Sequence, residues 1–175
     1  ETNIKIAKDI VSLANSARTK AKIKRRWPIS RIIVFMENDD LSKVSNLTEI
    51  MKTQMNTDTL AILAIPKIKD LYGRLAGLLN HNVVEASAKL KTKRIAPLLK
   101  NDLPKILSSF GNADQSKIIK TLISKGSFLI VYDGNDFEIL KEDVELSYSP
   151  APGYSMAESD TGDIVVFIET MRNND

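Results

Sequence analysis

The stretch SFLIVYDGNDFEIL, residues 127–140, decides the fold of the second half of the chain. Two β-rich runs flank DGND, in which Asp133 and Gly134 supply the positive backbone dihedrals that a tight hairpin needs. The runs VELSYS (144–149) and DIVVFIET (163–170) continue this pattern and are separated by PAPGYSMAESDTG, which is interpreted as a loop. The sequence therefore predicts an antiparallel set of strands in this half.

Upstream of the hairpin, helices alternate with short strands. Asp114 is expected to cap a helix that Gly126 ends, and Asp102 to cap a helix that ends at Gly111. Residues 89–101 are interpreted as a basic connection, and 83–88 as a strand. A helix is predicted over 66–79, with the proline in its first turn and Asn80 at its end, whereas the run before it is ambiguous between strand and helix.

The sequence of the first third of the chain predicts two helices, with one buried strand between them. The strand is RIIVFM (31–36), and a helix follows over 41–55 with Asp40 as its possible cap. A helix over 4–24 has a narrow, alanine-rich apolar stripe, so its partners are expected to be helices of a bundle outside the chain. The predicted class is α+β: an N-terminal helix from a helical bundle, then a mixed, largely antiparallel sheet with helices on one side.

Composition excludes several kinds of chemistry. The 175 residues are 43% hydrophobic, enough for a buried core, and include no cysteine and one histidine, His81. Disulfides, thiolate chemistry and zinc sites built from cysteine or clustered histidine are therefore excluded, and no metal site is predicted. No apolar run is long enough for a membrane span, and the first residues lack signal-peptide character, so we expect a piece of a longer soluble protein.

The segment RTKAKIKRRWPISR, residues 18–31, contains seven cationic side chains and no acid. Clustered Lys and Arg release counterions from a phosphate backbone, and the indole of Trp27 offers a face to a base or an arginine, so the chemistry suits RNA. Two structural alternatives stay open. The cations could complement the negative end of a helix dipole, and Trp27, held before Pro28, could seal a helix against a sheet.

The net charge of +3 conceals a polarity along the chain. Residues 1–31 hold nine Lys or Arg against two acids, and residues 89–105 hold six against one. Residues 133–175 hold eleven acids against two basic residues. A phosphate-bearing partner is expected to meet the first two segments and to avoid the third, unless the acidic and basic faces complement each other within the chain.

The basic segment resembles a motif of isoleucyl-tRNA synthetases, R-x-x-A-x-I-K-x-R-x-P-L, near their C-terminal end. The residues on the pattern are Arg18, Ala21, Ile23, Lys24, Arg26 and Pro28, with Ile29 in place of leucine. Blocks further along are similar to the same family in its archaeal and eukaryote-like form: NVVEASA (82–88), KRIAPLLKNDLPKI (93–106), the hairpin with the strand after it, and GDIVVFIET (162–170). Departures include Ala96 where glycine is usual, Ile168-Glu169-Thr170 in place of Leu-Asp-Thr, and a longer connection over 37–79.

The resemblance implies a division of the chain and a role for it. Residues 1–28 would end the helical anticodon-binding domain, and 29–175 would form the α/β module that follows. The parent enzyme would be a cytoplasmic ligase that joins isoleucine to its tRNA with ATP and magnesium. The family's His-x-Gly-His and Lys-Met-Ser-Lys-Ser motifs are missing from this chain, so the fragment is expected to bind without catalysing and to hold no cofactor of its own.

The predicted partners are isoleucine tRNA, through its anticodon stem and loop, and the remaining domains of the parent. A module that braces the anticodon-binding domain without touching RNA is the alternative. Carboxylates on and after the hairpin are interpreted as solvated surface, so no catalytic residue is predicted. The predicted tRNA-binding residues are Arg18, Lys20, Lys22, Lys24, Arg25, Arg26, Trp27 and Arg31, with Lys91, Lys93 and Arg94 as a secondary set.

Overall fold

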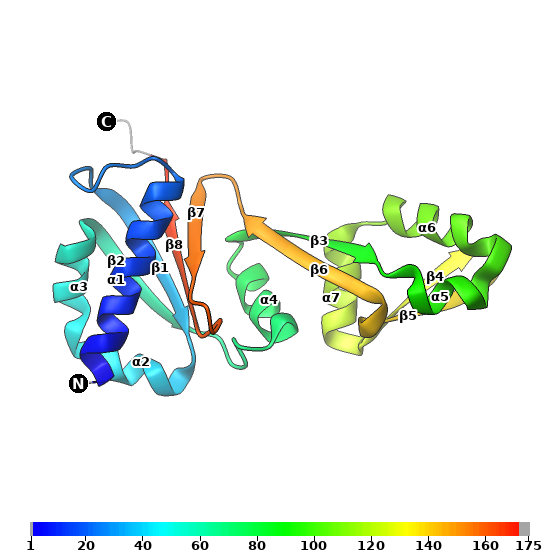
Figure 1. Cartoon of the computed structure of the whole chain (residues 1–175), viewed down its shortest axis with the longest axis horizontal. Helices are drawn as coiled ribbons and strands as arrows, with labels where there is room; N and C mark the ends of the chain where they lie inside the picture. Colours follow the sequence, from blue (N-terminus) through cyan, green and yellow to red (C-terminus); the bar gives the residue numbers. More distant parts are fainter. Residues whose placement is uncertain (1, 172–175) are drawn as a thin grey trace. The chain divides into compact units, whose positions relative to one another are not determined.

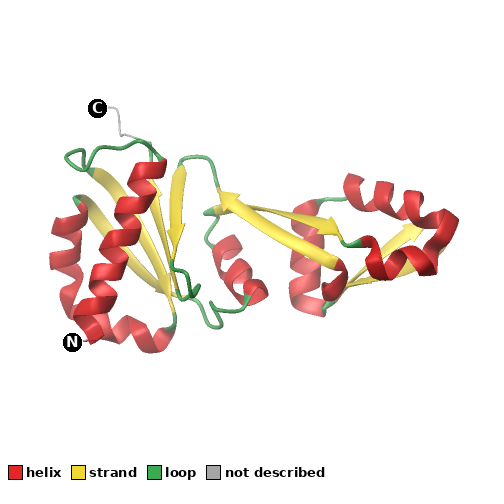
Figure 2. Cartoon of the chain, in the orientation of Figure 1, coloured by secondary structure: helices red, strands yellow, loops and turns green. Residues whose placement is uncertain are grey.

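The computed structural model describes residues 2–171, which form two compact units. Unit 1 takes the described residues up to Val84 and those from Pro150 on, and unit 2 is the continuous segment Glu85–Ser149. Both units contain helices and strands, and the sheets are mixed or antiparallel, so the predicted α+β class is confirmed (Figure 2).

Unit 1 is built on one mixed sheet of four strands. The strands are β1 (Ile29–Met36), β2 (Thr57–Ala64), β7 (Tyr154–Glu158) and β8 (Ile164–Glu169), in the order β2-β1-β8-β7 (Figure 1). β1 runs parallel to β2 and antiparallel to β8, and β7 is antiparallel to β8. The two central strands are almost wholly buried, as the continuous apolar runs RIIVFM and IVVFIE predict.

Helix α1 (Thr2–Lys20) covers one face of this sheet, with α2 (Asn38–Val44), the 3₁₀ turn η1 (Ser45–Leu47) and α3 (Thr48–Met55) beside it (Figure 1). Ile10, Ala14 and Ala17 are fully buried in the same apolar cluster as Ile32 and Val34. The expectation that this helix packs on a bundle outside the chain is therefore wrong. Small side chains at 14 and 17 let the helix approach the chain's own sheet closely.

Helix α4 (Leu71–Asn80) follows β2, and His81, the residue that caps its C-terminal end, lies on the opposite face of the sheet from α1. Phe35 and Phe167, which alternate with the α1-facing residues, are 5.7 Å apart between ring centroids, and Phe35 is 5.2 Å from His81 at the end of α4. The helix begins five residues later than predicted because Asp70 caps it, accepting from the Gly73 N–H at 2.9 Å. Its predicted end at Asn80 is confirmed.

Unit 2 contains the predicted hairpin, β4 (Ser127–Tyr132) and β5 (Asn135–Leu140), with Asp133 and Gly134 at φ of 47° and 76°. The caps expected for α7 (Gln115–Lys125) are also present: Asp114 accepts from the Ser116 and Lys117 amides, and Gly126 is left-handed. The remaining elements are β3 (Val84–Leu90), α5 (Thr92–Leu99), η2 (Lys100–Asp102), α6 (Leu103–Asn112), η3 (Lys141–Asp143) and β6 (Val144–Pro150). β3 pairs with β6.

Three local predictions are wrong. The C-terminal strands do not form one antiparallel set, because β6 pairs with β3, while β8 joins β1 and β7. The predicted loop at 150–162 contains β7, whose residues 155–157 are all buried, so the strand lacks the alternation that signals one. The basic connection at 89–101 includes helix α5, which tolerates Pro97 in its last turn.

The helix predicted over 41–55 is divided into α2, η1 and α3. Asp40 does not cap it, because the cap position of α2 is Glu37 and the carboxylate of Asp40 accepts from Lys43 Nζ at 2.7 Å, one turn further on. Val44 ends α2 with a ψ of −3°, which starts the 3₁₀ turn. Apolar spacing therefore located the helical region correctly but not its interruption.

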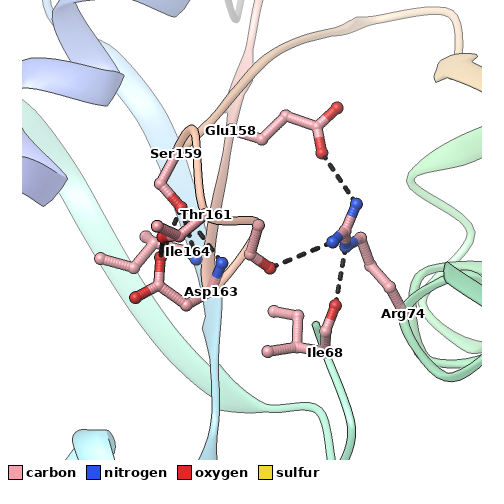
Figure 3. A network of polar contacts seen from close by, with 8 residues as sticks. Ile68, Arg74, Glu158, Ser159, Thr161, Asp163 and Ile164 are labelled. Carbon is pink, nitrogen blue, oxygen red and sulfur yellow. Dashed lines mark hydrogen bonds and ion pairs between the residues drawn. The ribbon is translucent and has the colours of Figure 1, made fainter. Parts of the chain in front are cut away.

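The turn between β7 and β8 is held by a polar network that includes α4 (Figure 3). The Ser159 hydroxyl donates to Asp163 at 2.6 Å and accepts from the Asp163 and Ile164 amides at 3.1 Å. Arg74 of α4 donates from Nε to the Ile68 carbonyl at 2.8 Å, and from its terminal nitrogens to Glu158 and to the Gly162 carbonyl, each at 3.3 Å. The turn is thereby fixed against the start of α4.

We expect Gly162→Ala to destabilise unit 1 by about 1–2 kcal/mol. Gly162 has a φ of 72°, and a Cβ there would run into the guanidinium of Arg74, which its other hydrogen bonds hold in place. The control is Gly111→Ala in α6, where a Cβ meets nothing within 4 Å and helix propensity favours alanine. Urea unfolding of both variants measures the effect, and equal stability of the two would contradict it.

Candidate nucleic-acid interface

The exposed part of the basic segment is a loop between α1 and β1. We define the basic loop as residues 21–28, in which the side chains of four cationic residues are exposed to solvent: Lys22, Lys24, Arg25 and Arg26. Its backbone is fixed by turn hydrogen bonds. The amides of Lys22 and Ile23 donate to the carbonyls of Thr19 and Arg18 at 3.1 and 2.9 Å, and the Trp27 amide donates to the Lys24 carbonyl at 3.0 Å.

Arg18 does not lie on this cationic surface, although the sequence predicted it to bind tRNA. Only 2% of the residue is exposed. Its terminal nitrogens donate to four backbone carbonyls: Lys24 at 3.1 Å and Trp27 at 2.8 Å in the basic loop, and Met55 at 2.7 Å and Asn56 at 3.1 Å at the C-terminal end of α3. The guanidinium is thus committed within the fold, and the prediction that Arg18 contacts phosphate is corrected to an internal role.

The partners of Arg18 explain why a charged group is buried here. The Met55 and Asn56 carbonyls lie at the C-terminal end of α3, where carbonyls lack helical partners and the helix dipole favours a cation. Burial, and to a smaller extent the charge of Arg25, lower the pKa of Arg18. The four carbonyl oxygens compensate for the lost hydration.

Asn56 is the second attachment point of the basic loop, and the sequence analysis did not single it out. Its backbone is left-handed, with a φ of 50°, which asparagine tolerates well. Its side-chain Nδ2 donates to the Arg25 carbonyl at 3.1 Å, and its own carbonyl accepts from the Ile29 amide at 3.0 Å. Arg18 and Asn56 together hold the main chain of the loop while leaving the side chains of its cations outside.

Trp27 is half-buried, and the Lys24 ammonium lies 5.5 Å from the centroid of its ring. The side chain of Trp27 is therefore partly packed within the fold. Lys20, the last residue of α1, donates from Nζ to the Met156 carbonyl of β7 at 3.0 Å, while Arg31 in β1 is exposed. Of the seven cations of the segment, Arg18 is buried and six are exposed, and one of those six, Lys20, donates to a backbone carbonyl.

The secondary basic segment belongs to unit 2. Lys91 and Lys93 are exposed, and Lys91 joins the segment to η3 through its backbone amide, which donates to the Asp143 carbonyl at 2.7 Å. Arg94 in α5 makes a bidentate ion pair with the Asp143 carboxylate, which is 1% exposed and also accepts from the Leu140 amide at 2.9 Å. Only the two lysines of this set present uncommitted side chains to solvent.

The ion pair sets the protonation of Asp143. The hydrogen bonds from Arg94, supported by the Leu140 amide, lower the pKa of the Asp143 carboxyl, while burial opposes this effect. Asp143 therefore remains a carboxylate at neutral pH and keeps Arg94 occupied. This pair links the start of α5 to the segment between β5 and β6.

Within residues 2–171, no three His, Cys, Asp or Glu side chains gather in a way that could hold a metal ion. None of the described helices is both long and apolar enough to cross a membrane.

Comparisons with known proteins place the similarity of this chain in one class, the aminoacyl-tRNA synthetases. No protein-family profile matches the chain. The isoleucine–tRNA ligase of Methanosarcina mazei is 29% identical over 168 residues, which cover 95% of this chain. Those of Methanothermobacter thermautotrophicus and Thermococcus kodakarensis are 24% and 25% identical over 172 residues each, or 97% and 98% of the chain.

The similarity to archaeal isoleucine–tRNA ligases that the basic motif predicts is therefore confirmed over nearly the whole chain. The chain spans only about 15% of the length of the first two of these relatives. It corresponds to a small part of a synthetase, and all three relatives are named as ligases.

Proposed function

We propose that this chain is the tRNA-binding C-terminal region of an archaeal-type isoleucine–tRNA ligase. The observation that carries the proposal is a match covering almost all of this chain but a small part of each relative, together with four exposed cations on a fixed loop within the motif. Lys22, Lys24, Arg25 and Arg26 would contact phosphates of the anticodon stem and loop, and Lys91 and Lys93 would form the secondary surface. Cations on a fixed backbone lose less conformational entropy when they bind.

The parent enzyme would join isoleucine to its tRNA in the cytoplasm, using ATP and magnesium held by domains outside this chain. The chain would contribute affinity for tRNA and contacts to the remaining domains, and it would not form the adenylate itself. Residue 28 stays the proposed boundary between the anticodon-binding domain and the following module in the parent sequence, although α1 packs on the sheet of unit 1.

The test is binding of the 175-residue chain to an isoleucine tRNA transcript over a series of salt concentrations. We expect binding to weaken with salt, because each phosphate contact adds a slope of roughly −0.7 to −0.9 to log affinity against log salt. Replacing Lys24, Arg25 and Arg26 with Ala should reduce the magnitude of that slope by roughly 2.1–2.7. These side chains are exposed, so folding should be unaffected.

The matched control removes three exposed lysines from α7: Lys117, Lys120 and Lys125. It changes the net charge by the same amount at a site that the proposal does not use. Equal losses of affinity in the two triple variants would mean that general charge, rather than the basic loop, attracts the RNA.

A bracing module without RNA contact is the second candidate, and one observation favours it. Arg18 and Arg94, both in the predicted tRNA-binding set, are engaged by partners within the chain. Under this alternative, the chain would bind the transcript weakly, and neither triple variant would change its affinity.

A further inference from the structure

Arg18 is the residue through which three parts of unit 1 meet: the end of α1, the end of α3 and the basic loop. Each of its two terminal nitrogens donates to two carbonyls. One bonds to Lys24 and Trp27 within the loop, and the other to Met55 and Asn56 at the C-terminal end of α3. All four hydrogens on these nitrogens can be used in this way, which fixes the plane of the guanidinium. The loop carbonyls are thereby tied to the end of α3.

In the basic loop, the backbone carbonyls of Lys24 and Arg25 point into the fold while the cationic side chains are exposed to solvent. The loop directs the Lys24 carbonyl inward to Arg18, and Asn56 draws in the Arg25 carbonyl, while the side chains of Lys24, Arg25 and Arg26 are exposed. Among the described residues, these inward bonds are what tie Lys24 and Arg25 to the end of α3. The direction of the cations therefore depends on a residue that solvent does not reach.

We propose that Arg18 is a positioning residue, which orders the basic loop for a phosphate backbone without touching RNA. This inference rests on the proposed function, since it assigns Arg18 a part in the binding made by Lys22, Lys24, Arg25 and Arg26. A lysine at this position would keep the charge, but its single ammonium cannot reproduce a planar group with two nitrogens bonded to two carbonyls each.

The experiment compares Arg18→Lys with the unchanged chain in two measurements. The first is amide hydrogen exchange at Ile23 and Trp27, whose amides make the turn bonds of the loop. The second is the affinity for an isoleucine tRNA transcript and its dependence on salt. Exchange at β1 and β8 is followed in parallel, because a general loss of stability would raise exchange there as well.

We expect exchange to rise much more in the loop than in β1 and β8, and affinity to fall about ten-fold if the ordered loop falls to roughly a tenth of the population. The slope against salt should stay the same, since no phosphate contact is removed. A side chain that contacts phosphate directly would behave differently, because lysine would largely replace it. Arg25→Ala is the matched contact variant, in which the slope should fall by the share of one phosphate contact, roughly 0.7–0.9, with loop exchange unchanged.

Unchanged loop exchange in Arg18→Lys would overturn the inference, as would faster exchange with unchanged affinity, or protection lost equally throughout unit 1. Failure of the unchanged chain to bind the transcript would instead refute the proposed function. Arg18→Gln gives a further check: a fall in slope of roughly 0.7–0.9 with the loop still ordered would identify Arg18 as a direct contact.

Discussion

Arg18→Met is expected to lower the free energy of unfolding of unit 1 by about 3 kcal/mol. Methionine keeps an unbranched apolar stem but removes every donor, so the four carbonyls that Arg18 now satisfies lose their partner. The bond to Met55 is buried, and the other three are partly buried, so water can replace only some of them. Each buried carbonyl left unpaired costs about 1–3 kcal/mol, and partial hydration reduces the total.

Trp27 provides the measurement, because it is the only tryptophan of the chain and lies in unit 1. Its fluorescence during urea unfolding should report unit 1 without a contribution from unit 2. Arg25→Met is the control, with the same substitution in an exposed side chain of the basic loop, and should change stability by less than about 0.5 kcal/mol. Similar losses in the two variants would contradict the internal role of Arg18.

Asp143→Asn is expected to destabilise unit 2 by about 2 kcal/mol, the usual range for hydrogen bonds to a charged group. The amide cannot accept both hydrogen bonds from Arg94 and the one from Leu140 that the carboxylate receives. The side chain of Arg94 is 44% exposed, so solvent hydrates it when the pair is lost and keeps the loss moderate. Glu142→Gln, at an exposed neighbouring position, is the control.

The same pair predicts a dependence on pH. Arg94 lowers the pKa of Asp143 in the folded state below its unfolded value of about 3.9. The carboxylate therefore contributes stability that is fully present above that value and is lost as the pH falls through the folded pKa. Amide hydrogen exchange in α7 and β4 should show a weaker acid destabilisation in Asp143→Asn than in Glu142→Gln. An identical pH dependence would contradict a stabilising charge at Asp143.

Local signals were read correctly from the sequence where a few adjacent residues determine the conformation. Asp133 and Gly134 adopt the positive φ that the hairpin requires, and Asp114 and Gly126 bound α7 as expected. Strand pairing was not predictable in this way, because the choice of neighbouring strand depends on contacts between residues that are distant in sequence. β7 escaped notice because proline and glycine precede it and both of its faces are covered.

The candidate interface was predicted in part, for the same reason. The sequence located a cationic segment between a helix and a strand, and the exposed loop lies there. It gave no indication that Arg18 turns inward, since that depends on the carbonyls of Met55 and Asn56, more than thirty residues away. The spacing of Arg94 and Asp143, forty-nine residues apart, hid their ion pair in the same way. A sequence shows which residues are charged, but not which distant residue each of them contacts in the fold.

The position of β8 in the sheet of unit 1 determines which of the two units can be completed first during synthesis on the ribosome. β8 lies between β1 and β7, yet it is the last strand to be synthesised, after all 65 residues of Glu85–Ser149. Domains fold during synthesis once their residues have emerged. Unit 2 can therefore fold first. Until β8 is made, the edge of β1 that pairs with it stays without its partner strand. The part of the chain made earliest can therefore complete its sheet only after the whole of unit 2 has been synthesised.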